Sequence, residues 1–169
     1  TASSHNRLFF VEVMGRDAGF IALSTGLSGG AEAILIPEHK IEISELVEML
    51  ENSYRRKKRS SLVIVAEGDE RGGAIEISKL VKAQLPEDLF DIRVTILGHI
   101  QRGGSPSARD RILSTRLGVS AVERLLEGGK NEWVGLVNNK SKYTSFSEAV
   151  THRKPLPDYI LGMIGKLSV

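Results

Sequence analysis

The residues best suited to chemistry lie in one stretch, Arg93-Val-Thr-Ile-Leu-Gly-His-Ile-Gln-Arg-Gly-Gly-Ser-Pro106. It holds Arg93, His99 and Arg102 around a loop with three glycines, after an apolar run at 92–97 that is typical of a strand. Two guanidiniums, an imidazole and accessible backbone amides suit a phosphate monoester. The stretch therefore predicts a phosphate cradle at a strand end, with a purely structural histidine as the open alternative.

Two other strand ends carry candidate residues. Met14-Gly-Arg-Asp-Ala-Gly19 follows an expected strand at 8–13, and its arginine offers a planar, permanently charged fork beside a glycine that permits close approach. We expect a helix to start directly afterwards, so that its free N–H groups add to an anion site. Glu67 directly follows the expected strand at 62–66 and could accept hydrogen bonds from sugar hydroxyls. An ordinary turn with a surface arginine, and a solvated acid, are the alternatives.

The expected elements alternate between short β-branched strands and longer helical segments, which indicates an α/β fold with a mostly parallel sheet flanked by helices, a Rossmann-like three-layer arrangement. Ligands bind such sheets beyond the carboxyl ends of the strands. Ser107 is the expected N-cap of the longest helix, which should stop at Gly128-Gly129. Strands are expected at 8–13, 32–36, 62–66, 92–97 and 133–137, and helices at 17–27, 43–57, 74–84, 107–127, 145–150 and 157–167, with linkers at 70–73 and 140–144.

Composition excludes several classes of protein. The 169 residues contain no cysteine, so disulfides, thiolate nucleophiles and cysteine-bound zinc are excluded. The net charge is +2 and aromatics are only 5%, with none inside the basic cluster at 55–59, so we expect no nucleic-acid partner. No apolar run approaches the roughly 20 residues that span a bilayer, and no signal peptide is visible, so a cytoplasmic location without membrane contact is expected.

Familiar catalytic motifs are absent from the sequence. It has no Gly-x-x-x-x-Gly-Lys-Ser/Thr loop, no Gly-x-Gly-x-x-Gly fingerprint and no Gly-x-Ser-x-Gly elbow. No general base is apparent either. The residues alone thus predict a phosphate-binding half-site, which binds more clearly than it reacts.

The ordered motifs resemble bacterial ATP-type 6-phosphofructokinases. The resemblance rests on Ser3-Ser-His-Asn-Arg7, Val11-Glu-Val-Met-Gly-Arg16, Ala66-Glu-Gly68, the stretch at 97–106 and Asp110-Arg-Ile-Leu113. It implies transfer of the ATP γ-phosphoryl group to the 1-hydroxyl of fructose 6-phosphate with Mg²⁺, a step of glycolysis. By resemblance, the fructose 6-phosphate contacts are Met14, Gly15, Arg16, Glu67, His99 and Arg102.

The resemblance also assigns individual roles. Arg16 would steady the transferring phosphoryl group as a catalytic residue. Arg7 and Arg93 would reach the 6-phosphate of a neighbouring subunit in a homotetramer. An ADP-like effector would bind a separate allosteric site, to which Glu32 contributes as a magnesium ligand and Arg56 and Lys58 contribute charge. A solvated helix end explains the two basic residues equally well.

The resemblance divides the chain into two parts. Residues 1–102 and 152–169 would form the fructose 6-phosphate-binding domain, and 103–151 would belong to the ATP-binding domain. The family's glycine-rich ATP loop and its catalytic aspartate precede these regions, so we expect this chain to be one part of a longer enzyme and inactive alone. For 103–151 we expect mobility or contacts with another chain. A pyrophosphate-dependent enzyme, and a non-enzymatic phosphoanion binder, are the alternatives.

Overall fold

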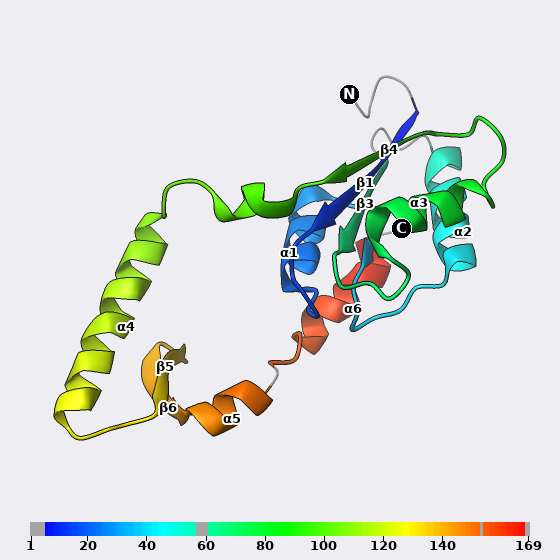
Figure 1. The fold of residues 1–169 in the computed structure, drawn as a ribbon. Coiled ribbons are helices and arrows are strands. Elements are labelled where there is room, and N and C mark those ends of the chain that lie inside the picture. Colours follow the sequence, from blue (N-terminus) through cyan, green and yellow to red (C-terminus); the bar gives the residue numbers. More distant parts are fainter. Residues whose placement is uncertain (1–5, 57–60, 153, 168–169) are drawn as a thin grey trace. The chain divides into compact units, whose positions relative to one another are not determined.

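The protein consists of two compact units (Figure 1). A computed structural model describes residues 6–56, 61–152 and 154–167. The first unit comprises Thr1–Gly103 with Leu156–Val169, and the second comprises Gly104–Pro155.

The first unit is built on a four-stranded sheet. Its strands are β1 (Arg7–Val13), β2 (Ala33–Leu35), β3 (Ser61–Ala66) and β4 (Asp91–Ile96), in the order β2-β3-β1-β4. All neighbouring pairs are parallel. Because the strands are parallel, their carboxyl ends all meet at one edge of the sheet, here called the carboxyl edge, and their amino ends meet at the opposite amino edge.

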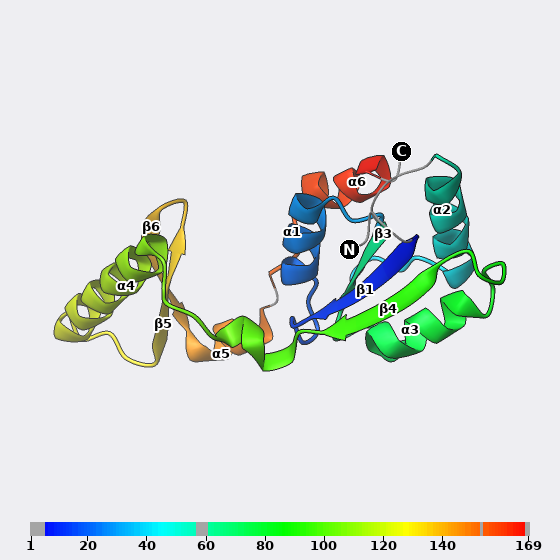
Figure 2. The same ribbon diagram turned by 90° about the horizontal axis from the view of Figure 1, so that it is seen from above.

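Helices cover both faces of this sheet (Figure 2), which confirms the expected three-layer α/β fold. On one face, Leu8, Phe10 and Val63 pack against α2 (Ile43–Arg55) and α3 (Gly73–Lys82). On the other, Ile34 and Ile64 pack against α1 (Phe20–Gly29) and α6 (Asp158–Leu167). The alternation of side chains along each strand sends successive residues to opposite faces. Burial of each large apolar side chain stabilises the fold by about 1.5–3 kcal/mol.

The second unit is a helix packed on a β-hairpin. It contains α4 (Ala108–Leu126), β5 (Glu132–Val137), β6 (Lys140–Ser145) and α5 (Phe146–Thr151). Ser107 caps α4 as expected: its Oγ accepts from the Asp110 N–H, and the Asp110 carboxylate accepts from the Ser107 N–H at 2.8 Å. No described residue between 104 and 155 is buried. The mobility or outside contacts expected for this region stay predictions.

Three local expectations were wrong. The expected linker at 140–144 is strand β6, joined to β5 by Asn138 and Asn139, whose φ angles of 50° and 61° are those of a type I′ hairpin turn. Helix α1 begins at Phe20 rather than at residue 17, after an irregular loop. The first part of the expected glycine-rich loop at 98–106 is a short 3₁₀ helix, η2 (Gly98–Arg102).

Candidate functional site

Three loops meet at the carboxyl edge of the sheet. The loop Met14–Gly19 follows β1, the turn at 67–72 follows β3, and η2 follows β4. Because β1 lies between β3 and β4, these loops are spatial neighbours. The carboxyl-edge site is defined here by the residues they contribute that the sequence had singled out: Met14, Gly15, Arg16, Glu67, His99 and Arg102.

Glu67 is the centre of this site. Its Oε1 accepts two backbone hydrogen bonds, from the Gly15 N–H at 3.2 Å and from the Arg16 N–H at 2.7 Å. These two bonds hold the pKa of the Glu67 carboxyl below its usual range, and the positive charges of Arg102 and Arg16 lower it further. The structure therefore brings a carboxylate, ionised at neutral pH, together with two arginines.

The backbone of Arg16 is held in an uncommon conformation. Its φ is +53°, in the left-handed region, which non-glycine residues seldom adopt. Gly68 allows the loop after β1 to come close to the turn after β3, because a Cβ at that position would lie 1.9 Å from the Arg16 carbonyl oxygen. Gly15 is similarly constrained, since its Cβ would lie 2.3 Å from the Ala18 carbonyl oxygen. Both glycines thus serve close backbone approach.

The third side of the site comes from η2. Gln101 accepts a hydrogen bond from the Met14 N–H at 3.3 Å and donates one to the Gly98 carbonyl at 3.1 Å. It ties η2 to the loop after β1. His99 and Arg102 lie on the same short helix with exposed side chains. Sequence reasoning missed Gln101, although it stands within the singled-out stretch, between His99 and Arg102.

The expected anion site at the start of α1 stays a prediction, although one of its backbone donors already has a partner within the chain. The helix begins later than expected, and the N–H of its N-cap Gly19 donates to the Glu38 carboxylate at 2.9 and 3.0 Å. The start of α3 is occupied in the same way, because the Ala74 N–H donates to Glu12 at 2.8 Å. The chain's own carboxylates therefore accept from one backbone donor at the start of each of these helices, and the exposed arginine side chains are further candidates for binding an anionic ligand.

Arg7 and Arg93 lie away from the carboxyl-edge site. Both contact one oxygen of Asp91: Arg7 Nε at 3.3 Å, and Arg93 Nε and Nη2 at 3.2 and 2.9 Å. Hydrogen bonds from Arg93, and then from Arg7, hold the pKa of Asp91 below its usual range. Arg7 begins β1 and Met14 follows its end, so the seven residues of the strand separate them by about 20 Å. Sequence reasoning missed Asp91, whose only signal is its place two residues before Arg93.

Two of the three predicted effector residues, Glu32 and Arg56, lie near the amino edge. Glu32 is buried directly before β2, and Arg56 follows the end of α2, on the way to β3. Lys58 lies outside the described residues. Within the described ranges, no group of three or more metal-binding side chains gathers in one place. A metal ligand role for Glu32 stays a prediction.

Among the helices of the described ranges, none is long and apolar enough to cross a membrane.

The carboxyl-edge site lies on the described parallel sheet and combines an ionised carboxylate with exposed arginines. Such a combination is typical of domains that bind phosphorylated, hydroxyl-rich small molecules.

Comparison with known proteins gives the family. The sequence profile of phosphofructokinase matches residues 1–125. The chain is 47% identical over its full length to ATP-dependent 6-phosphofructokinase 2 of Bacteroides thetaiotaomicron, covering 51% of that protein. It is 51% identical over 92% of its length to ATP-dependent 6-phosphofructokinase 1 of Thermus thermophilus, covering 48% of it. The chain therefore belongs to the phosphofructokinase family, and it spans about half the length of these curated relatives.

Solved structures agree with this assignment. Phosphofructokinase from Saccharomyces cerevisiae superimposes with a TM-score of 0.76 at 34% identity, over 98% of this chain and 22% of the yeast chain. A pyrophosphate-dependent phosphofructokinase from Marinobacter aquaeolei superimposes with a TM-score of 0.78 at 25% identity, over 92% of this chain and 43% of the other.

Proposed function

We propose that this chain supplies the fructose 6-phosphate-binding part of an ATP-dependent 6-phosphofructokinase. The observation that carries the proposal is the ionised Glu67, hydrogen-bonded to the Gly15 and Arg16 amides and close enough to Arg102 for that charge to lower its pKa. A sugar phosphate needs an acceptor for its hydroxyls and cations for its phosphate, and this site offers both.

The residues of the carboxyl-edge site take separate roles. Both backbone hydrogen bonds to Glu67 end on Oε1, so Oε2 is the oxygen that meets sugar hydroxyls. Arg102 and His99, on η2, bind the 6-phosphate. Met14 and Gly15 form the backbone wall beside the sugar. Arg16 stabilises the charge that develops on the transferring phosphoryl group.

Arg7 and Arg93 serve a different subunit in this proposal. Arg7 begins β1, about 20 Å along the strand from Met14, and Arg93 lies in register with Phe9, short of the end of β4; these positions support the role. Two guanidiniums on one carboxylate oxygen retain a net positive charge that suits a phosphate. The homotetramer expected for the family would bring these arginines to a neighbour's carboxyl-edge site.

The remaining parts of the reaction lie beyond the described site. ATP is the phosphoryl donor in this proposal, as in the names of the bacterial relatives, and Mg²⁺ neutralises charge on its phosphates. Pyrophosphate is the alternative donor, supported by the likeness to the Marinobacter enzyme. A cytoplasmic location and an ADP-like effector, bound by Glu32, Arg56 and Lys58, belong to the same proposal.

The test is a titration of the ¹⁵N-labelled chain with fructose 6-phosphate, followed by NMR. The proposal predicts saturable shifts of the amides of Gly15, Arg16 and Arg102, with smaller shifts from inorganic phosphate, which lacks the hydroxyls that Glu67 would bind. Glu67→Gln should weaken the sugar phosphate more than it weakens inorganic phosphate. Shifts confined to the second unit, or identical responses to the two ligands, would contradict the proposal.

A further inference from the structure

The loop between β2 and α2 supports the carboxyl-edge site from behind. This loop, residues 36–41, is called the brace here. Its first four residues form a tight turn in which the His39 N–H donates to the Ile36 carbonyl at 3.2 Å. Pro37 fixes one backbone angle of that turn, and Ile36 and Ile41 are buried at its two ends. The brace is therefore anchored at both ends.

The brace holds one end of the loop Met14–Gly19. Both oxygens of Glu38 accept from the Gly19 N–H, at 2.9 and 3.0 Å. A Cβ at Gly19 would lie 2.4 Å from Ile36 Cγ2 and 2.9 Å from Glu38 Oε2. The end of the loop thus packs directly on the brace, and Glu38 provides the cap that the start of α1 does not get from its own residue.

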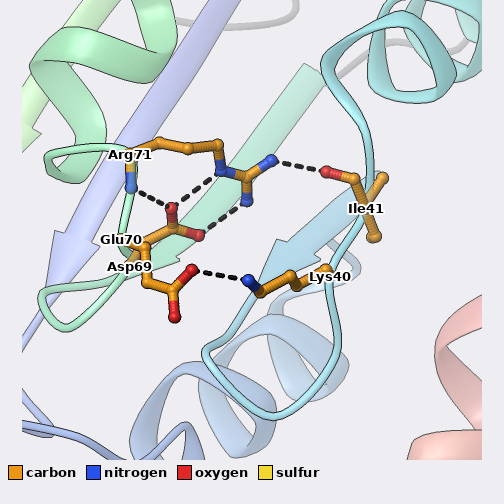
Figure 3. Close-up of polar contacts among 5 residues, drawn as sticks. All are labelled: Lys40, Ile41, Asp69, Glu70 and Arg71. Carbon is orange, nitrogen blue, oxygen red and sulfur yellow. Dashed lines mark hydrogen bonds and ion pairs between the residues drawn. The ribbon is translucent and has the colours of Figure 1, made fainter.

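The brace also holds the turn that carries Glu67 (Figure 3). Arg71 donates through Nη1 to the Ile41 carbonyl of the brace. The same guanidinium binds Asp69 through Nε at 2.8 Å and Nη2 at 2.7 Å. Asp69 is buried, and its own N–H donates to the Ala66 carbonyl at 3.1 Å. The turn after β3 is thereby fixed to the brace two residues from Glu67.

Glu67 and Arg16 depend on both attachments. The 2.7 Å bond between them joins the loop held by Glu38 to the turn held by Arg71. We propose that the brace positions Arg16 and Glu67 for sugar-phosphate binding, with Glu38 and Arg71 as positioning residues that do not touch the ligand. The identity of the ligand rests on the proposed function. The positioning of Arg16 and Glu67 by the brace does not depend on it.

A neighbouring ion pair gives a matched control. Lys40 of the brace contacts Glu70 of the same turn, but the two side chains are 67% and 75% exposed (Figure 3). Exposed pairs contribute little because water and salt screen them. Glu70→Ala therefore removes a carboxylate that joins the same two segments, and it leaves the attachments made by Glu38 and Arg71 in place.

The experiment compares Glu38→Ala, Glu38→Gln, Arg71→Lys and Glu70→Ala. The first readout is the solvent exchange rate of the Gly15 and Arg16 amides by NMR, without ligand. Neither amide contacts Glu38 or Arg71 directly, so faster exchange reports loss of position. We expect about tenfold faster exchange in Glu38→Ala and Arg71→Lys, partial recovery in Glu38→Gln, whose amide oxygen still accepts a hydrogen bond, and no change in Glu70→Ala.

The second readout is the dissociation constant of fructose 6-phosphate, which should rise about tenfold in Glu38→Ala and stay unchanged in Glu70→Ala. Unchanged exchange in both Glu38→Ala and Arg71→Lys, or equal acceleration in Glu70→Ala, would overturn the proposal. If the unmodified chain does not bind the sugar phosphate, the proposed function fails, and the exchange rates alone decide on the brace. If Glu38→Ala does not fold, Glu38→Gln and Arg71→Lys decide in the same way.

Discussion

Gly68 offers the sharpest test of the site's geometry. In Gly68→Ala, the new Cβ would lie 1.9 Å from the Arg16 carbonyl oxygen and 3.3 Å from the Asp17 Cα. Real Cβ contacts stay above 3.0 Å, so the Arg16 peptide or the turn after β3 must move by more than 1 Å. The neighbouring atom is backbone, which yields less readily than a flexible side chain. We expect the free energy of unfolding to fall by about 1–3 kcal/mol, the usual cost of overpacking.

The displacement also reaches the binding site. Moving the Arg16 peptide lengthens its 2.7 Å bond to Glu67, so fructose 6-phosphate binding should weaken along with stability. Unfolding of the first unit has to be followed by far-UV circular dichroism or NMR, because the single tryptophan, Trp133, lies in the second unit.

Gly29→Ala is the control for this substitution. It lies at the end of α1, where a Cβ would meet Leu62 at an ordinary 3.7 Å. Alanine is the better helix former, so this variant should be unchanged or more stable by up to about 1 kcal/mol. If Gly68→Ala unfolds like the unmodified chain and binds the sugar phosphate equally well, the proposed crowding around Arg16 is refuted.

Two further predictions concern the two units separately. Arg71 holds the pKa of Asp69 below its usual range, so the pair stabilises the fold above the unfolded-state pKa of about 4, and this stabilisation is lost as the pH falls through the lower folded-state pKa. Chemical unfolding followed by circular dichroism between about pH 6 and pH 2 should therefore show a shallower loss of stability in Asp69→Asn than in the unmodified chain. An equal slope in the two proteins would contradict this. Ser107→Ala should destabilise the second unit by about 1 kcal/mol through loss of the helix cap, measured by Trp133 fluorescence. Ser114→Ala, inside the same helix, should change it less.

Much of the fold could be predicted from residue patterns. The strands appear in the sequence as β-branched runs, and Ser107 and Gly128 mark the start and the end of the long helix. Strand β6 was missed because Lys140-Ser-Lys-Tyr-Thr144 has little apolar character, and its pairing depends on two asparagines with positive φ. A turn rule for Asn-Asn would have found it.

The candidate site could be predicted only in part. Glycines and arginines at strand ends pointed to the right edge of the sheet, because parallel strands end together. One donor at the start of α1 was misjudged because Glu38, 19 residues away in sequence, accepts from the Gly19 N–H. Gln101 and Asp91 were missed for the same reason. Gln101 accepts from Met14 and Asp91 accepts from Arg7, 87 and 84 residues away in sequence, and no local pattern encodes these two contacts.

The affinity of the Arg102→Ala variant for fructose 6-phosphate shows whether the carboxyl-edge site binds this sugar phosphate. Isothermal titration calorimetry with fructose 6-phosphate is carried out on the unmodified chain, on Arg102→Ala and on Arg109→Ala. Arg102 is the residue proposed to bind the phosphate, and Arg109 is an exposed arginine of the second unit that serves as the control. Loss of a charge-assisted contact predicts weakening by about 1.5–3 kcal/mol for Arg102→Ala and no change for Arg109→Ala. Equal affinities for all three proteins would contradict the account.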